Sequence, residues 1–425
     1  MMTASSNGHS NPRGDHVVII GAGQAGGAVA AGLRQQGYSG AITLLGDEAE
    51  APYQRPPLSK AFLKGDTDVE ALKLRPESFY LDRDIDFQPV TQVEAIDLTA
   101  RRVRITGRPS VAWTRLVLAT GARARTLRAP GADLDGVISL RTLADAEALK
   151  RRLQPGARLV ILGGGYVGLE IAASARALGV EVLVLERESR CMARVACGPL
   201  STFMEKIHRE RGVVIETGVS AVGFQGDHGV ITGVRLNDGR LVPCDVCVVG
   251  VGAEPNDELA RASGIVVASG VVVDDRGRTS ATGVYAAGDV TWRPLGPERR
   301  MVRIESVPNA LEQAKQIVAD ILDLPAPAPE VPWFWSDQYE FKIQIAGIPH
   351  DPDRQIVRWI TDGAAFAVFH LKGGDVVGAE AVNAPREFMF AKQVLANGWR
   401  IDADRLADPD VALKELVLEK AVEVT

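Results

Sequence analysis

Two strand–glycine–helix segments, 142 residues apart from Gly21 to Gly163, constrain the fold of this chain more than any other feature of its sequence. Each consists of an apolar strand, a glycine turn, a helix and a second strand, over residues 16–46 and again over residues 158–186. Backbone N–H groups at the start of such a helix point at a phosphate, and the glycines let that phosphate approach. The repeat predicts an α/β protein with two Rossmann-like dinucleotide-binding domains.

The glycine spacing, together with the acid that follows, makes each match more specific than a lone glycine-rich turn. The glycines are Gly21, Gly23 and Gly26 in the first turn, and Gly163, Gly165 and Gly168 in the second. The acid after the second strand is Asp47, with Glu48 as a substitute, in the first unit and Glu186 in the second. A carboxylate at that position accepts hydrogen bonds from ribose hydroxyls. Two dinucleotides in one chain favour hydride transfer between a nicotinamide and a flavin.

Three further segments are expected to meet at the first nucleotide. Two strands end on Thr120–Gly121 and on Gly288–Asp289, and the Asp289 carboxylate could accept hydrogen bonds from the ribityl hydroxyls of a flavin. A helix that begins near Pro308 would direct the positive end of its dipole at the flavin pyrimidine ring. The alternative for Gly288–Asp289 is a plain turn.

Composition excludes several other classes of protein. The 425 residues, 46% of them hydrophobic, are enough for two or three domains with large cores. A net charge of −6 argues against a nucleic-acid binder, which would show a basic face. No apolar run approaches the ~20 residues of a membrane span. The first residues lack the apolar core of a signal peptide, and residues 1–14 are expected to form a disordered tail.

The cysteines fit a reducing compartment, so a cytoplasmic location is expected. They are Cys191, Cys197, Cys244 and Cys247, and the last two form a C-x-x-C in PCDVC. That segment reads as a strand, in which residues three apart point to opposite faces, so buried thiols are favoured over redox or metal chemistry. No second C-x-x-C and no histidine cluster completes a metal site, and no metal is expected.

The composition changes near Leu324, where LPAPAPEVP predicts a semi-rigid linker. The runs IVRWI, AAFAVFHL and VVGAEAV that follow, separated by DG and KGGD, predict an antiparallel meander. PREFMFAKQVLANG predicts a helix that packs on it and stops at Gly398. The last ~100 residues are therefore expected to form a separate α+β domain.

Five segments together resemble one family. They are PYQRPPLSKAFLKG (52–65), ILGGGYVGLE (161–170), YAAGDV, RIESVPNALEQA (303–314) and WFWSDQY (333–339). In this order they are similar to the NADH-dependent ferredoxin reductases of bacterial oxygenase systems, the putidaredoxin reductase and biphenyl dioxygenase reductase type. The resemblance implies a glutathione-reductase-like arrangement with a discontinuous FAD domain (15–120 and 253–325), an NAD domain (121–252) and a C-terminal domain (326–425).

The resemblance also implies a function. Electrons would pass from NADH through FAD to a [2Fe-2S] ferredoxin that feeds a cytochrome P-450 or Rieske-type oxygenase, in a monomer or weak dimer. Lys60 of PPLSK would lie near flavin N5 and pair with Glu170, and these two are the expected catalytic residues. The residues expected to contact FAD are Gly21, Gly23, Ala25, Gly26, Asp47, Lys60, Val93, Thr120, Gly121, Arg141, Gly288, Asp289, Val307 and Trp335. Those expected to contact NAD are Gly163, Gly165, Tyr166, Gly168, Glu186 and Gly252.

Several alternatives stay open at this point. Lys60 could be a solvated surface lysine, and the tryptophans of WFWSDQY could be hydrophobic core. Disulfide reductases and single-cysteine oxidases need a thiol near the flavin, whereas residues 1–190 contain no cysteine. Three rivals remain: a rubredoxin reductase, a reductase of a small-molecule radical, and a flavoprotein like apoptosis-inducing factor. Basic residues that could dock a ferredoxin are Arg75, Arg299, Arg300, Lys315 and Lys414.

Overall fold

The computed structural model of the chain describes residues 14–296, 298–361 and 363–419, and it divides into two compact units. Unit 1 comprises Met1–Gln54, Lys73–Arg123 and Pro255–Pro329, and unit 2 comprises Arg55–Leu72, Ala124–Glu254 and Glu330–Thr425. The predicted disordered tail lies, except for Gly14, outside the described residues. The predicted bounds of the FAD, NAD and C-terminal domains stay a prediction.

Unit 1 is built on a five-stranded parallel sheet whose strand order is β19-β7-β1-β2-β3. Its strands are β1 (His16–Ile20), β2 (Ala41–Leu45), β3 (Ile85–Gln88), β7 (Arg115–Leu118) and β19 (Val284–Ala286). Their apolar runs are buried, as in Val17, Val18 and Ile19 of β1, which are all fully inaccessible. The strands of a parallel sheet are apolar along their whole length because both faces of the sheet are covered.

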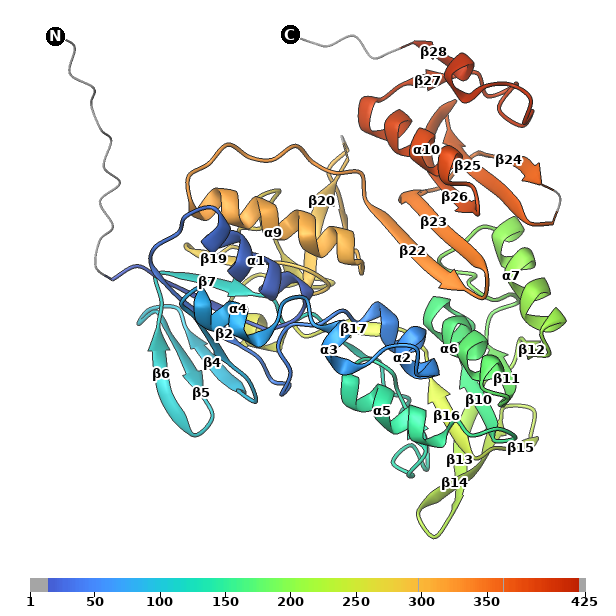
Figure 1. Cartoon of the computed structure of the whole chain (residues 1–425), viewed down its shortest axis with the longest axis horizontal. Coiled ribbons are helices and arrows are strands. Elements are labelled where there is room, and N and C mark those ends of the chain that lie inside the picture. The colour runs from blue at the N-terminus through green and yellow to red at the C-terminus, as the bar shows by residue number, and fades with distance from the viewer. Residues whose placement is uncertain (1–13, 297, 362, 420–425) are drawn as a thin grey trace. The chain divides into compact units, whose positions relative to one another are not determined.

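Helix α1 (Gln24–Gln35) follows β1 and lies side by side with α9 (Val307–Ile321), as Figure 1 shows. The two helices share a core with Val29, Leu33 and Ile317. Helix α1 ends as the sequence predicts, because Gly37 takes a left-handed φ of +86° just beyond the C-cap. Helix α9 begins after the N-cap Ser306, whose hydroxyl accepts from the Asn309 N–H.

The remaining elements of unit 1 are smaller. They are the antiparallel strands β4 (Val93–Asp97), β5 (Arg102–Ile105) and β6 (Arg108–Ala112), the strands β18 (Val271–Val272), β20 (Thr291–Leu295) and β21 (Arg300–Val302), and the helices α4 (Glu77–Asp82) and α8 (Glu258–Ala262). The chain passes from one unit to the other along β8 (Ala122–Ala124) and β17 (Ala253–Pro255).

Unit 2 repeats the same parallel design with the strand order β12-β11-β10-β16-β9. The strands are β9 (Val137–Ile138), β10 (Arg158–Leu162), β11 (Glu181–Glu186), β12 (Val214–Thr217) and β16 (Val246–Val249). Helices α5 (Leu143–Arg152), α6 (Tyr166–Ala177) and α7 (Gly198–Glu210) accompany them, with the antiparallel strands β13 (Ala221–Asp227), β14 (Val230–Leu236) and β15 (Leu241–Pro243). The structure thus confirms the predicted strand–helix–strand repeat.

The C-terminal part of unit 2 is an antiparallel sheet of order β22-β23-β26-β25-β24 with helix α10 (Pro385–Asn397) against it. Its strands are β22 (Trp333–Gln338), β23 (Phe341–Gly347), β24 (Arg354–Thr361), β25 (Ala365–Lys372) and β26 (Asp375–Val382). The predicted meander and helix are confirmed, and Gly398 caps α10 in a left-handed conformation. The last elements are β27 (Arg400–Ile401), the short 3-10 helix η2 (Leu413–Leu416) and β28 (Val417–Glu419).

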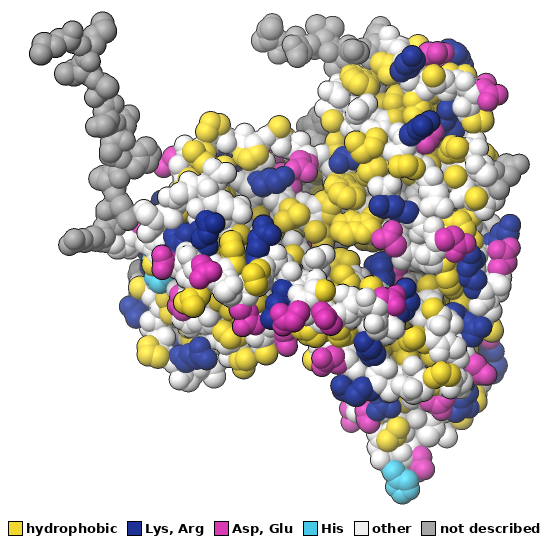
Figure 2. All heavy atoms as spheres, viewed as in Figure 1, with side chains coloured by type: hydrophobic (Ala, Val, Ile, Leu, Met, Phe, Trp, Pro, Cys, Tyr) yellow, Lys and Arg dark blue, Asp and Glu magenta, His cyan; other side chains and the backbone are white. Residues whose placement is uncertain are grey.

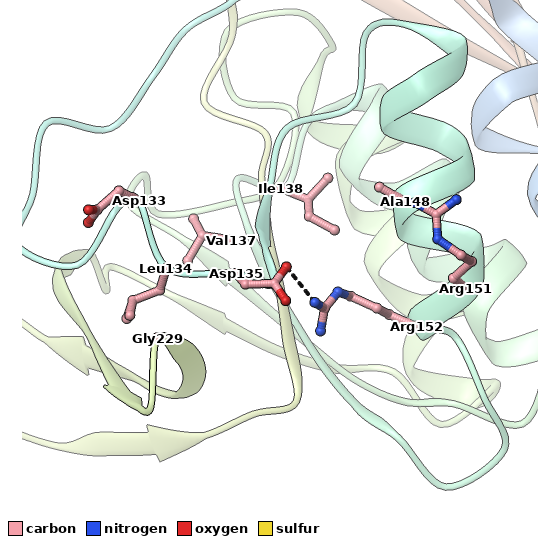
Figure 3. Close-up of a pocket in the computed structure, with 10 residues that line it drawn as sticks. Asp133, Leu134, Asp135, Val137, Ile138, Ala148, Arg151, Arg152 and Gly229 are labelled. Carbon is pink, nitrogen blue, oxygen red and sulfur yellow. Dashed lines mark ion pairs between the residues drawn. The ribbon is translucent and has the colours of Figure 1, made fainter.

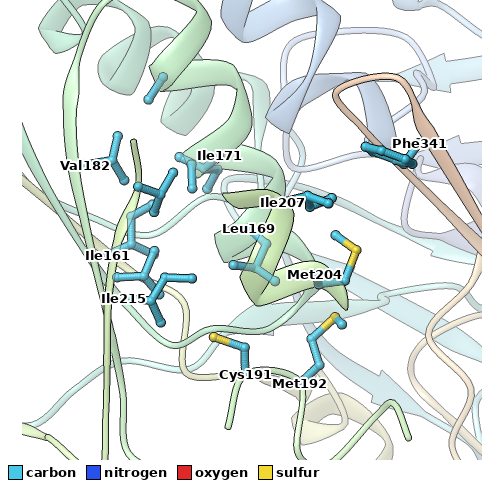
Figure 4. Close-up of a cluster of buried hydrophobic side chains, with 14 of the residues drawn as sticks. Ile161, Leu169, Ile171, Val182, Cys191, Met192, Met204, Ile207, Ile215 and Phe341 are labelled. Atoms are coloured by element: carbon cyan, nitrogen blue, oxygen red, sulfur yellow. The ribbon is translucent and has the colours of Figure 1, made fainter. Parts of the chain in front are cut away.

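One hydrophobic core joins this antiparallel sheet to the parallel sheet of unit 2. Figure 4 shows Leu169 and Ile171 of α6, Met204 and Ile207 of α7, and Phe341 of β23 in the same cluster. The segment that carries PPLSK belongs to the same unit, as η1 (Pro56–Ser59), α2 (Ala61–Lys64) and α3 (Val69–Leu72), and Leu63 is buried in this core. Lys60 is therefore held against α6 within one folded unit. Among the described helices, none has the length and hydropathy of a membrane span.

Candidate functional site

The first glycine turn is shaped by contacts that only glycine can make. Gly21 has a φ of +107°, and a Cβ there would lie 2.1 Å from the Ala119 carbonyl oxygen. A Cβ on Gly26 would lie 1.9 Å from the carbonyl oxygen of Gly21. Gly23, the N-cap of α1, faces open space instead, with no atom within 4 Å of an added Cβ. The outer glycines therefore serve packing, whereas the middle one keeps a space empty at the helix start.

The second turn repeats this geometry in unit 2. Gly163 has a φ of +105°, with the Gly250 carbonyl oxygen 2.4 Å from an added Cβ, and Gly168 packs in the same way on Gly163. Gly165 caps α6 and again has no atom within 4 Å of an added Cβ. An empty space in front of helix N–H groups fits a pyrophosphate, because the N–H donors and the helix dipole both favour an anion there. The geometry of both turns therefore fits a bound pyrophosphate.

The acids that follow the two turns are held differently. Glu186 ends β11 and is clamped by the backbone, since its carboxylate accepts from the N–H of Gly164 at 2.7 Å and of Glu188 at 2.8 Å. In unit 1, Asp47 is exposed, whereas Glu48 is half-buried and accepts from the Tyr53 hydroxyl at 2.6 Å. The choice between Asp47 and Glu48 as the ribose ligand stays a prediction.

The strand ends expected at the first nucleotide do lie together. Strand β7, which leads to Thr120–Gly121, sits between β1 and β19, which leads to Gly288–Asp289. Gly288 has a φ of +81°, and its added Cβ would lie 3.2 Å from the Ala25 side chain. Two polar residues that the sequence did not single out fix these ends: Asn256 exchanges hydrogen bonds with Thr120, and the Gln313 side chain accepts from the Gly288 N–H at 2.8 Å.

Lys60 and Glu170 form the ion pair that the resemblance implied, so this pairing is confirmed. The Lys60 ammonium lies 2.7 Å from Glu170 Oε2 and 3.1 Å from the Pro56 carbonyl oxygen. The side chains are 18% and 5% exposed, which contradicts a solvated surface lysine. A charge pair with so little water around it interacts more strongly than a surface pair. Its place beside a flavin stays a proposal.

The predicted site residues divide between the two units. Unit 1 holds Gly21, Gly23, Ala25, Gly26, Asp47, Val93, Thr120, Gly121, Gly288, Asp289 and Val307. Unit 2 holds Lys60, Arg141, Gly163, Gly165, Tyr166, Gly168, Glu170, Glu186, Gly252 and Trp335. Arg141 precedes α5, and its carbonyl accepts from Arg55 at 2.8 Å. Trp335 of β22 packs on Trp333 with ring centroids 5.5 Å apart.

The structure contradicts the expected orientation of Cys244 and Cys247 and confirms their burial. Cys244 and Cys247 do not point to opposite faces but lie in one core cluster, because the strand begins only at Val246 and leaves Cys244 outside the alternation. Both are buried, as expected, and burial raises the pKa of Cys244 to about 12. The fold also brings together three buried residues that are far apart in the sequence, Cys197, His370 and Glu380. The Glu380 carboxylate accepts from the Cys197 N–H and lies 3.1 Å from His370 Nε2.

Unit 2 also contains a hollow. It is lined by the segment Asp133–Ile138, by Ala148, Arg151 and Arg152 of α5, and by Gly229, and Figure 3 shows the Asp135–Arg152 ion pair inside it. None of the predicted site residues lines it. The hollow is therefore no candidate for the dinucleotide sites, which the glycine turns define instead.

Comparison with known proteins identifies the family. Residues 15–314 match the pyridine nucleotide-disulphide oxidoreductase family, and residues 333–417 match the reductase C-terminal family. The chain belongs to this family of reductases. It is 45% identical over 405 residues to a probable ferredoxin reductase, CtmF, of Castellaniella defragrans, covering 95% of this chain and 99% of the relative. It is 42% identical over 417 residues to the putidaredoxin reductase CamA of Pseudomonas putida, covering 97% and 99%.

A solved structure agrees with these relatives. The reductase in the crystal structure of a covalent putidaredoxin reductase–putidaredoxin complex superimposes with a TM-score of 0.93 at 40% identity, covering 95% of this chain and 98% of that one. The predicted family and fold class are thereby confirmed.

Proposed function

We propose that this chain carries electrons from NADH through FAD to a [2Fe-2S] ferredoxin that feeds a cytochrome P-450 or Rieske-type oxygenase. The observation that carries the proposal is the pair of matching glycine turns, each with an open space at its middle glycine. Relatives that match nearly the whole chain are named ferredoxin or putidaredoxin reductases, including a biphenyl dioxygenase system component. We place the activity in the cytoplasm, where NADH is available and thiols stay reduced.

The proposed cofactor sites follow the two turns. FAD would be held at Gly21, Gly23 and Gly26 by the N–H groups of α1, with the Thr120–Gly121 and Gly288–Asp289 strand ends beside it. NADH would be held at Gly163, Gly165 and Gly168, with Glu186 on its ribose. FAD supplies the ability to accept a hydride and to release the electrons singly. Lys60, proposed near flavin N5, would stabilise negative charge that arrives on the ring.

NADH is expected to be preferred over NADPH. Hydrogen bonds from two backbone N–H groups hold the Glu186 carboxylate in place. The negative charge of this carboxylate would repel a 2′-phosphate. The neighbouring Arg187 is exposed and turned to Glu188, 2.9 Å away. Steady-state kinetics should give a kcat/KM about 10 to 100 times higher for NADH, equivalent to ~1.4–2.7 kcal/mol.

Two variants at the ends of one strand test that assignment. Glu186→Gln should narrow the NADH/NADPH ratio, whereas Glu181→Gln, which removes the same charge at the exposed start of β11, should leave it unchanged. A wild-type ratio near one, or one that favours NADPH, would contradict the role of Glu186.

Ferredoxin docking is expected to depend on local basic residues, because the chain as a whole carries −6 and a [2Fe-2S] ferredoxin is usually acidic. In Figure 2 basic and acidic side chains are interspersed on the face drawn. Arg75, Arg299, Arg300 and Lys315 are exposed residues of unit 1, and Lys414 is an exposed residue of unit 2. Arg299 is already paired with Asp275 at 2.8 Å, which makes Arg75 and Arg300 the better targets.

The double variant Arg75→Glu/Arg300→Glu should lower ferredoxin reduction several-fold at low ionic strength and flatten its salt dependence. Rim charges act mainly on association, and this effect is screened beyond ~8–10 Å at physiological salt. Ferricyanide reduction, which needs no docking, should stay unchanged. Arg235→Glu on β14, which makes half of this change in net charge away from the proposed docking residues, serves as a control. Ferredoxin turnover that ignores both salt and these reversals would point to apolar docking instead, with Trp333 and Trp335 as the next residues to test.

The deciding experiment is NADH-driven cytochrome c reduction with candidate carriers added one at a time. A [2Fe-2S] ferredoxin should support turnover, whereas a rubredoxin should not. Turnover with rubredoxin alone would favour the rubredoxin reductase alternative, for which a 38% identical relative from Pseudomonas putida, a rubredoxin-NAD(+) reductase, is the precedent.

A further inference from the structure

Glu170 receives more hydrogen bonds than its ion pair with Lys60 requires. Its Oε2 accepts from the Ser59 hydroxyl at 2.5 Å as well as from the Lys60 ammonium, and its Oε1 accepts from the Ser336 hydroxyl at 2.5 Å. Both oxygens of this buried carboxylate are thus engaged by donors. Ser336 lies on β22, in the antiparallel sheet, so the carboxylate is held from two sides of unit 2.

The hydrogen bonds continue beyond Ser336 into the core. The Gln338 amide nitrogen lies 3.1 Å from Ser336 Oγ, and the amide oxygen lies 2.8 Å from His208 Nε2 on α7. Ser336 and Gln338 are two residues apart in a strand, so they share its buried face. Ser336, Gln338 and His208 are 0%, 1% and 0% exposed. Tyr339 closes the series, with its hydroxyl 3.2 Å from His208 Nδ1.

The direction of every bond in this series follows from its first one. The Ser336 hydroxyl donates its proton to Glu170, so the Ser336 oxygen must accept from the Gln338 NH₂ group. The Gln338 amide oxygen then faces His208, whose Nε2 must carry the proton, and Nδ1 is left to accept from Tyr339. All donors therefore point toward Glu170, as an ionised carboxylate requires.

We propose that Ser336, Gln338 and His208 are positioning residues that hold the Glu170 carboxylate in one orientation and, through it, fix the Lys60 ammonium. The inference rests on the proposed function in that Lys60 acts at the flavin. Four segments meet in this way: η1 with the start of α2, helix α6, strand β22 and helix α7. A displacement of about 1 Å in a reacting group can lower the rate ~10²-fold, so residues that fix the orientation of Glu170 and Lys60 should affect the rate of flavin reduction.

Removal of the Ser336 hydroxyl tests the proposal at its first link. Ser336→Ala should slow flavin reduction by saturating NADH about tenfold, with KM for NADH changed less, because Glu170 Oε1 loses its donor. Ser336→Thr, which restores a hydroxyl, should recover most of the rate. Ser201→Ala is the matched control, since it deletes another buried hydroxyl of unit 2, one that bonds the Cys191 carbonyl and not this series.

Two variants of His208 test the far end. His208→Gln can place an amide N–H where Nε2 donates and should keep the rate, whereas His208→Leu cannot and should lower it. A second readout is independent of activity: imidazole NMR, with His208 assigned through its loss in His208→Gln, should show the Nε2–H tautomer. Ser336→Ala should shift that resonance, because Gln338 is released at the other end.

The titration of His208 tests whether this imidazole is buried in the folded chain, which the series of hydrogen bonds requires. Burial lowers the pKa of His208 from 6.5 to about 4, opposed by the Gln338 hydrogen bond and aided by Arg211. The groups that face it are Arg211, Tyr339 and, beyond Tyr339, Arg176 and Glu340. As the pH falls, this histidine is protonated in the unfolded chain before it is protonated in the folded chain. The stabilisation of the folded state by neutral His208 is therefore complete above pH 6.5 and is lost as the pH falls toward 4. The wild-type unfolding constant should rise by about two orders of magnitude more than that of His208→Gln over this window.

The outcomes separate the inference from the function on which it rests. Wild-type reduction rates in Ser336→Ala and His208→Leu, with only a loss of thermal stability like that of Ser201→Ala, would overturn the positioning role. An Nδ1–H tautomer of His208 would overturn it as well, because the series of donors would be broken. A wild-type protein whose flavin NADH fails to reduce would instead overturn the proposed function, while the tautomer and the titration could still be measured.

Discussion

Replacement of Gly23 by leucine is expected to give a folded but colourless protein. The wild type should be yellow, with one FAD per chain held without a covalent bond. A Cβ added at Gly23 meets no protein atom within 4 Å, and the φ of −88° suits any residue, so the substitution should leave the protein's own packing intact. The leucine would occupy the space that fits a pyrophosphate, and FAD affinity should fall by about 100-fold or more, equivalent to ~2.7 kcal/mol.

Two other glycines provide controls for this experiment. Gly165→Leu fills the equivalent space in unit 2 and should spare the colour while raising KM for NADH. Gly21→Leu should destabilise the fold itself, because its φ is +107° and the Ala119 carbonyl oxygen blocks the side chain. Flavin content, circular dichroism and thermal unfolding distinguish the three. A Gly23→Leu protein that keeps a full complement of FAD would contradict the site, as would a colourless wild type with a normal fold.

The parts of this fold that the sequence predicted are those that local patterns encode. The apolar runs of β1 and β10, the glycines that follow them and the amphipathic α9 each depend on neighbours close in sequence. The same holds for the C-terminal meander, where KGGD marks the turn between β25 and β26. Repetition of one unit then made the dinucleotide interpretation specific.

The parts that the sequence missed depend on contacts between distant residues. Ser336 and Glu170 are 166 positions apart, and nothing near either one marks the other as its partner. A cue did exist in WFWSDQ, where Ser336 and Gln338 place two polar side chains on the same face of the strand as Phe334. Buried polar groups need partners, so such a pair indicates a network even when its other members cannot be named.

The error at Cys244 has a simpler origin. Alternation predicts opposite faces only inside a strand, and the strand begins two residues later, at Val246. The buried group of Cys197, His370 and Glu380 was beyond reach for the same reason as the Ser336 network, since β25 and β26 bring His370 and Glu380 to the N-cap of α7. Local periodicity fixes which residues are buried better than it fixes what they face.

The second large effect is expected at the Lys60–Glu170 pair. Lys60→Ala and Glu170→Ala should each slow flavin reduction by NADH by about 10²-fold, the loss typical when a preorganised electrostatic group is removed from a developing charge. FAD affinity should change less, because the pair is proposed to act at the ring and not at the pyrophosphate. Stopped-flow reduction at saturating NADH measures the rate, and flavin retention during gel filtration measures the affinity.

The two variants should fail for different reasons, and this difference is itself a test. Lys60→Ala leaves Glu170 with the Ser59 and Ser336 donors, whereas Glu170→Ala leaves a largely buried ammonium with the Pro56 carbonyl and deprives both serines of their acceptor. Either variant leaves a buried charge without its counter-ion and should lower the melting temperature, Glu170→Ala by more, because the carboxylate left by Lys60→Ala keeps two hydroxyl donors. Lys64→Ala, four residues on and paired with the exposed Asp66, is the matched control and should change neither quantity. Unchanged reduction rates in both Lys60→Ala and Glu170→Ala would make the pair a purely structural link between α2 and α6.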